Sequence, residues 1–258
     1  MFFRRLAAQL AHQNWVAILI EFAIVVAGVF VGTQVSNWNS DRLEQRRATG
    51  YLARIEANLR DDLGAAQASV EYWHTVIAYG EEAIDYADHG HLVGGSRWRT
   101  VLAFYQASQL STYRIDDTTY QELRSAGDLG LLRGGKLSQA LAGYYVTGPV
   151  PSSPHLVQYN PEYRTIVRSY TPVAVSDYIW DHCVVEAGKL GEGFNPDCPS
   201  PISDAEAQSL LDRYVGTPGL VPALRFWVSN QKVAARMVES SEKDAQSLLA
   251  LVRAQLGR

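Results

Sequence analysis

The chain has 258 residues, of which 47% are hydrophobic and 19% are charged, and its formal net charge is −4. This mild acidity excludes the basic surface that nucleic-acid binding requires, so we expect no nucleic-acid partner. The mean hydropathy of −0.12 excludes a polytopic membrane protein, and the residues outside one apolar segment suffice for a single domain with a hydrophobic core.

Residues 15–38, "WVAILIEFAIVVAGVFVGTQVSNW", form the most apolar segment. Along a helix its two terminal tryptophans lie about 34 Å apart, close to the ~30 Å hydrocarbon core of a bilayer. We therefore predict a transmembrane helix over 15–38, with Trp15 and Trp38 at the two lipid interfaces. A buried core helix and a cleaved signal peptide are the alternatives. The length of the apolar run and the acid inside it, Glu21, favour an uncleaved anchor.

Residues 1–14 are predicted to form a short amphipathic segment at the membrane surface, with Arg4 and Arg5 as further interface anchors. These arginines favour a cytoplasmic N-terminus, whereas Arg42, Arg46 and Arg47 after the span favour the opposite topology. Large domains are exported largely regardless of charge, which weakens the second argument. We expect a single-pass membrane protein, with the N-terminus in the cytoplasm and residues 39–258 on the other side of the membrane.

Two cysteines, Cys183 and Cys198, enclose the glycine-containing loop "CVVEAGKLGEGFNPDC". A disulfide that closes a loop of this size stabilises an exported domain by about 3 kcal/mol. Two unrelated free thiols are the alternative. The disulfide is the preferred interpretation, and it agrees with export of the domain that contains it.

A helical-wheel projection of the predicted span places Gly28 and Gly32 within about 20° of Glu21, and Asn39 falls on the same line. Val25 lies beside this line. The opposite face carries the apolar residues Leu19, Ala23, Val26 and Phe30. Small residues allow close helix approach and a polar side chain then bonds across the contact, so this face is predicted to pack against another transmembrane subunit or a second copy. The alternative is that Glu21 reaches the lipid interface alone.

Residues 39–90 are predicted to continue the anchor as a helical stalk that ends near Gly94 and Gly95. Apolar residues recur along it at threes and fours, at Leu52, Ile55, Leu59, Leu63, Ala66, Val70, Trp73 and Ile77. Ser203 and Glu206 predict a capping box, and a long helix from about Val221 is expected to pack antiparallel to the stalk. We predict an extended crossover over 149–172, with "YRTIVRSY" as the best strand candidate. The predicted fold is mainly α, with an extramembrane helical bundle.

Two blocks of the sequence bear a likeness to known proteins. The segment "RRLAAQLAHQNWVAILIEFAIVVAGVFVGTQVSNWNSDR" resembles the N-terminus of an uncharacterised bacterial family of single-pass inner-membrane proteins, whose anchor ends in a QVxNWN motif. The segment "TTYQELRSAGDLGLLRGGKLSQALAGYY" is similar to a second block of that family. The resemblance covers roughly a quarter of the chain. It implies a helical, single-pass protein of the bacterial inner membrane, with residues 39–258 in the periplasm, and no particular activity.

Candidate chemical sites are sparse. His89 and His91, with Asp88, form a possible metal set in "DHGH". His182, Cys183, Asp197 and Cys198 form a zinc-like alternative to the disulfide. An exposed polar turn at a helix end is the simpler interpretation of "DHGH", and the disulfide is the simpler interpretation of the two cysteines. We therefore expect no metal, cofactor or catalytic residue. The predicted function is a non-catalytic accessory or scaffold subunit, and the alternative is a sensory ectodomain that signals through a membrane partner.

Overall fold

The computed structural model describes residues 15–110, 113–132, 135–152, 160–185 and 193–257, and it is mainly helical. The chain divides into two compact units, Met1–Gly50 and Tyr51–Arg258. The helix α2, Trp15–His89, contributes to both units. The predicted amphipathic segment, residues 1–14 with Arg4 and Arg5, lies outside the described residues.

In the N-terminal unit, the described chain consists of residues 15–50 of α2. This part of the helix is long and apolar enough to cross a membrane by length and composition, and none of its most apolar window is buried. Large side chains along it are exposed, Phe22 by 66% and Phe30 by 62%. A helix in the core of a soluble domain would bury such side chains, so the structure does not support the core-helix alternative.

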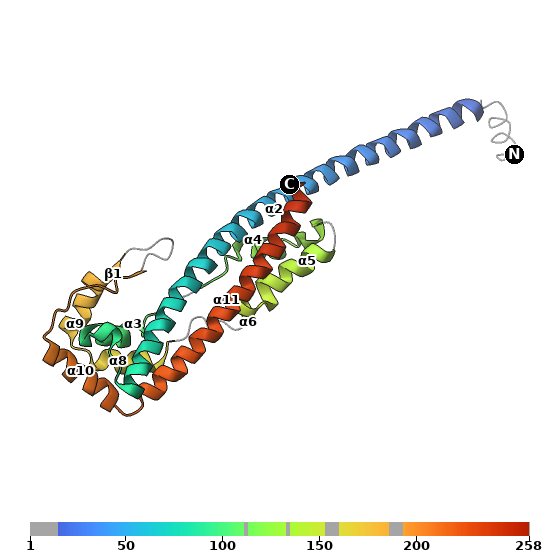
Figure 1. The fold of residues 1–258 in the computed structure, drawn as a ribbon. Helices are drawn as coiled ribbons and strands as arrows, with labels where there is room; N and C mark the ends of the chain where they lie inside the picture. The colour runs from blue at the N-terminus through green and yellow to red at the C-terminus, as the bar shows by residue number, and fades with distance from the viewer. Residues whose placement is uncertain (1–14, 111–112, 133–134, 153–159, 186–192, 258) are drawn as a thin grey trace. The chain divides into compact units, whose positions relative to one another are not determined.

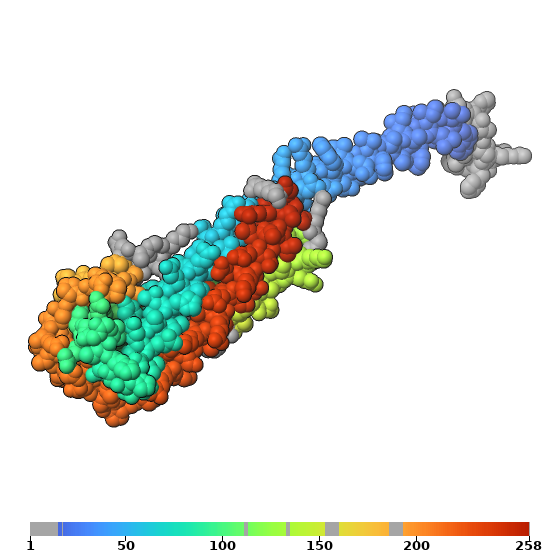
Figure 2. Space-filling model, in the orientation of Figure 1, coloured from blue at the N-terminus to red at the C-terminus, as the bar shows by residue number. Residues whose placement is uncertain are grey.

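In the second unit, α2 and α11, Leu220–Leu256, run antiparallel. Polar side chains connect the two helices, and as the residue numbers rise along α2 those of their partners fall along α11. Arg253 donates from Nε to Oε1 of Glu56 at 3.0 Å, and Gln67 donates from Nε2 to Oε1 of Glu242 at 3.1 Å. Further along, Glu81 pairs with Lys232 and Asp88 with Arg225. Figures 1 and 2 show α11, in red, lying against this part of α2.

The predicted apolar stripe of α2 faces the interior of the second unit. Leu52, Ile55, Leu59, Ala66, Trp73 and Ile77 are buried, while Leu63 and Val70 are half-buried. The helix ends at His89 and not at Gly94–Gly95 as predicted. Gly90 adopts a left-handed φ of 74° and donates its N–H to the Tyr86 carbonyl at 2.8 Å, which is a usual glycine C-cap.

Short elements fill the interval between the two long helices. They are η1 Val93–Gly95, α3 Arg97–Gln106, α4 Thr118–Ser125, η2 Asp128–Leu131, α5 Gly135–Ala142, η3 Gly143–Thr147, α6 Pro149–Ser152, α8 Glu162–Tyr170, α9 Val173–Tyr178, η4 Ile179–Cys183, β1 Val184–Val185, β2 Gly193–Phe194 and α10 Asp204–Gly216. The capping box predicted at Ser203 and Glu206 is confirmed at the start of α10. The long helix expected from about Val221 is α11, which begins at Leu220.

The predicted strand "YRTIVRSY" is wrong, because these residues form α8. Tyr163 and Val167, four residues apart, are fully buried on one face, and the Tyr163 hydroxyl donates to the Phe104 carbonyl at 2.6 Å. Helices α6 and α8 likewise replace part of the predicted extended crossover, with residues 153–159 outside the description. Among the described residues the one sheet pairs β1 with β2 antiparallel, in the register Val184↔Phe194.

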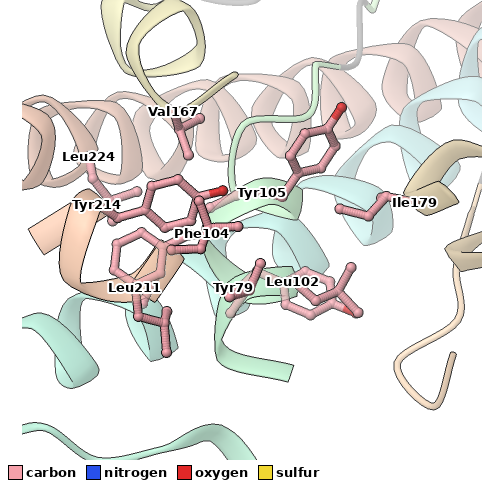
Figure 3. Packing of buried hydrophobic residues seen from close by; sticks show 14 of the residues in the cluster. Tyr79, Leu102, Phe104, Tyr105, Val167, Ile179, Leu211, Tyr214 and Leu224 are labelled. Carbon is pink, nitrogen blue, oxygen red and sulfur yellow. The ribbon is translucent and has the colours of Figure 1, made fainter. Parts of the chain in front are cut away.

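The largest cluster of the core gathers side chains from α2, α3, α8, α10 and α11. Figure 3 shows its centre, where Phe104 and Tyr214 lie next to each other, with ring centroids 5.3 Å apart. Two smaller clusters continue the core along the α2–α11 pair, one around Tyr51 and Leu248 and the other around Trp73 and Val238. The second unit is therefore organised along the two long antiparallel helices.

Candidate functional site

The predicted interface residues of the anchor lie on one continuous stretch of α2. Glu21, Val25 and Asn39 are exposed, and a Cβ added to Gly28 or Gly32 would meet no atom within 4 Å. Helical geometry places Glu21, Gly28, Gly32 and Asn39 along one line of the surface, which we call the Glu21 face. This face presents a carboxylate, an amide and two positions without side chains to whatever packs against it.

The two tryptophans predicted as interface anchors are also exposed, Trp15 by 60% and Trp38 by 63%. The guanidinium carbon of Arg42 lies 5.7 Å from the centroid of a Trp38 ring, a cation–π geometry. An aromatic ring beside an arginine suits the interfacial zone of a bilayer, where apolar and charged groups meet. Sequence reasoning treated Arg42 only as a topology signal, although its spacing of four residues from Trp38 already indicated the contact.

A cluster of two histidines and an aspartate lies at the C-terminal end of α2. Nδ1 of His89 is 2.8 Å from Oδ1 of Asp85, and Nδ1 of His91 is 3.0 Å from Oδ2 of the same carboxylate. The imidazole rings stack with centroids 5.4 Å apart. The three residues each offer a ligand atom within 4.8 Å of the others, and all three are exposed. Hydrogen bonds to His89 and His91 lower the pKa of Asp85 below its ordinary value.

The structure corrects the metal set suggested by "DHGH", because Asp85 and not Asp88 accompanies the two histidines. Asp85 precedes His89 by one helical turn, so the two side chains share a face. The left-handed Gly90 then turns the chain and brings His91 back to the same carboxylate. Asp88 instead pairs with Arg225 of α11.

The structure joins Cys183 and Cys198 in a disulfide with a Cα–Cα separation of 5.2 Å. This bond uses both thiols, so the zinc-like alternative is not formed. His182 stacks on Tyr178 with ring centroids 4.2 Å apart, and Asp197 pairs with Arg99 at 2.5 Å. The Trp98 indole donates to the Cys198 carbonyl at 3.1 Å, which ties the disulfide to α3.

Sequence reasoning missed a buried carboxyl group, Asp62, in the middle of α2. It accepts hydrogen bonds from the Asp116 backbone N–H at 2.9 Å and from the Tyr144 hydroxyl at 2.9 Å. Burial raises the pKa of Asp62 to about 6, although both hydrogen bonds oppose that shift. Burial, followed by the charge of Asp62, raises the pKa of Tyr113 to about 12. A signal was present, since Asp62 follows Leu59 by three residues and therefore belongs to the apolar stripe.

A partly buried guanidinium is another polar group that the sequence did not reveal. Arg168 of α8 donates from Nε to the Ser108 hydroxyl at 3.0 Å and from an Nη to Oε1 of Gln109 at 2.9 Å. Its guanidinium carbon lies 4.7 Å from the Tyr105 ring centroid and 5.6 Å from that of Trp180. Burial lowers the pKa of Arg168. Among the described residues its polar partners are neutral side chains.

Comparison with protein-family models, with curated proteins and with solved structures finds no match to this chain. The candidate sites therefore rest on their own geometry. The Glu21 face and the Asp85–His89–His91 cluster are the two main candidates, because both include residues singled out in the sequence and both are exposed.

Proposed function

We propose that this chain is a non-catalytic single-pass protein of the bacterial inner membrane that acts as an accessory or scaffold subunit. In this proposal, residues 15–38 cross the bilayer and the Glu21 face packs against another transmembrane subunit or a second copy. Residues 39–258 form a helical domain in the periplasm. The observation that carries the proposal is the apolar stretch of α2, whose most apolar window is not buried by any of the described residues.

The Glu21 face supports lateral packing more than simple anchoring. An unpaired carboxylate in the apolar part of a bilayer costs about 2–3 kcal/mol on insertion scales, and a hydrogen bond to a neighbouring helix offsets that cost. Open space beside Gly28 and Gly32 would let a second backbone approach closely. A span that served only as an anchor would gain nothing from an acid on the same line as two glycines.

The disulfide supports the proposed orientation. Disulfides persist in oxidising compartments such as the periplasm and are rare in the cytosol. The bond between Cys183 and Cys198 thus favours export of the C-terminal domain, with the amino end of the chain, including Arg4 and Arg5, in the cytoplasm.

The proposal is tested by purifying the full-length protein from its native membrane in mild detergent and identifying co-purifying proteins by mass spectrometry. We expect one or more membrane proteins, or a second copy of the chain, at a stoichiometric level. Glu21→Ala should reduce their recovery several-fold, because interhelical hydrogen bonds contribute about 0.6–2 kcal/mol.

Glu44→Ala is the matched control, since Glu44 is an exposed acid of the same helix beyond the predicted span. It should leave recovery unchanged. Recovery of a lone monomer, equally for the unmodified chain and for Glu21→Ala, would contradict the proposal.

A further inference from the structure

We propose that Asp85, His89 and His91 form a binding site for a divalent first-row transition metal such as Zn²⁺. This site lies in the second unit and is independent of the proposed membrane function. The inference rests on three side chains at the end of α2 whose ligand atoms all lie within 4.8 Å of one another.

The geometry brings together the atoms that would bind the ion. Zinc binds imidazole nitrogen and carboxylate oxygen at about 2.0–2.2 Å, so ligand atoms around one ion are roughly 3.3 Å apart. Here the Nδ1 atoms of His89 and His91 lie 2.8 and 3.0 Å from the Asp85 carboxylate. Small rotations of exposed side chains would therefore admit an ion. Each neutral imidazole would carry its single proton on Nε2 and leave Nδ1 free to bind.

The donor set selects the class of metal. Imidazole nitrogen suits zinc, copper and nickel, whereas Mg²⁺ and Ca²⁺ prefer sites made of oxygen ligands alone. Three protein ligands leave at least one coordination position for water or for a ligand from another molecule. All three side chains are exposed, so the ion would be reached directly from solvent.

The surrounding backbone supports a cation at this position. The last carbonyl groups of α2 carry the partial negative charge of a helix C-terminus, which favours positive charge nearby. Gly90, with φ of 74°, fixes the turn that places His91 beside Asp85, and this conformation is costly for other residues. Asp88, the other acid of this turn, forms an ion pair with Arg225. Asp85 is therefore the carboxylate that lies beside the two imidazoles.

A purely structural role for the cluster is the competing explanation. In that case Asp85 accepts two hydrogen bonds and holds the helix end, and the protein has no particular affinity for a metal. The two explanations differ in one measurable property, which is zinc affinity that depends on both histidines.

The test is a zinc titration of the full-length protein, purified in detergent without a polyhistidine tag, in competition with a chromophoric zinc chelator. We expect one zinc ion per chain, with His89→Ala and His91→Ala each weakening the affinity at least tenfold. His74→Ala is the matched control, because His74 is an exposed histidine of the same helix that lies 3.4 Å from Glu239 and outside the Asp85–His89–His91 cluster. It should bind zinc as the unmodified chain does.

Equal zinc affinity in the unmodified chain and in the His89→Ala/His91→Ala double variant would overturn the proposal. An equal loss in His74→Ala would also overturn it, because the binding would then be unspecific. Far-ultraviolet circular dichroism in the absence of metal checks that the variants keep their helices. We expect no change, since both histidines are more than 60% exposed.

Discussion

At the scale of single residues, Asp62 links stability to pH. Its pKa is about 6 in the folded chain and 3.8 in the unfolded chain, so the folded state binds the proton more tightly. Folding is therefore favoured as the pH falls from above 6 towards 4, and the gain is lost as the pH rises through 6. Between pH 7.5 and pH 5 this coupling should add about 1.4 kcal/mol to the free energy of unfolding.

Asp62→Asn removes the titrating group and should abolish that gain. Urea unfolding of the full-length protein in detergent, followed by tryptophan fluorescence at both pH values, measures it. Asp61→Asn, at the exposed neighbouring position, should keep the pH dependence of the unmodified chain. Identical pH dependence in Asp62→Asn and the unmodified chain would show that the Asp62 pKa is not raised.

Gly80 is required by close packing between α2 and α11. A Cβ at this position would lie 2.4 Å from Cγ2 of Val228 and 3.7 Å from both Ala107 and Leu224. Gly80→Ala should therefore lower the free energy of unfolding by about 1–3 kcal/mol, the usual cost of overpacking a core. Thermal unfolding of the variant measures the effect.

Gly50→Ala is the control for Gly80→Ala, because nothing lies within 4 Å of a Cβ added there. It should be neutral or stabilise the chain by up to about 1 kcal/mol, since alanine favours the helix more than glycine does. A loss of stability in Gly50→Ala as large as in Gly80→Ala would contradict the packing explanation.

At the scale of elements, the disulfide between Cys183 and Cys198 closes the segment that contains β1 and β2. In the chain-entropy account, a loop of this length contributes about 3 kcal/mol to stability. Replacing both cysteines by serine should lower the free energy of unfolding by about that amount. A reducing agent should have the same effect on the unmodified chain and none on the double variant. Equal stability in all four conditions would show that the bond is absent in solution.

The sequence predicted the long helices better than the short ones. The stripe from Leu52 to Ile77 extends over many turns, so its period identifies a helix without knowledge of its neighbours. Residues 162–170 offer only two turns and include Thr165, Ile166 and Val167, whose branched side chains also suit strands. The helix is stabilised by contacts with α3, among them the hydrogen bond from the Tyr163 hydroxyl to the Phe104 carbonyl. These contacts join residues far apart in the sequence, so the local sequence pattern does not predict them.

The candidate sites divide in the same way. The Glu21 face follows from spacing on one helix and was predicted. The His89–His91 pair was visible in "DHGH", but its carboxylate partner depends on where α2 ends, and Gly90 rather than Gly94 ends it. The hydrogen-bond donors to Asp62 belong to Asp116 and Tyr144, which are over 50 residues away in the sequence. Sequence spacing could therefore indicate that Asp62 is buried, but it could not identify these donors.

At the scale of the whole molecule, residues 15–38 and residues 39–258 are proposed to lie in different surroundings, the bilayer and the periplasm. If the C-terminal domain is periplasmic, alkaline phosphatase fused after residue 258 should be active, because that enzyme needs an oxidising compartment to form its disulfides. The same fusion to a chain that lacks residues 1–38 should be inactive. An inactive fusion on the full chain, with a fluorescent cytoplasmic reporter at the same position, would reverse the assigned orientation.

The central claim is that the Glu21 face contacts a neighbouring helix, and site-specific photo-crosslinking in native membranes tests it most directly. Val25 and Val26 lie at nearly the same depth but about 100° apart around the helix, on the Glu21 face and on its apolar opposite. A photoreactive amino acid at Val25 should give a discrete crosslinked band that Glu21→Ala weakens, while the same group at Val26 should label lipid. Equal crosslinking from both positions, or none from Val25, would contradict the account.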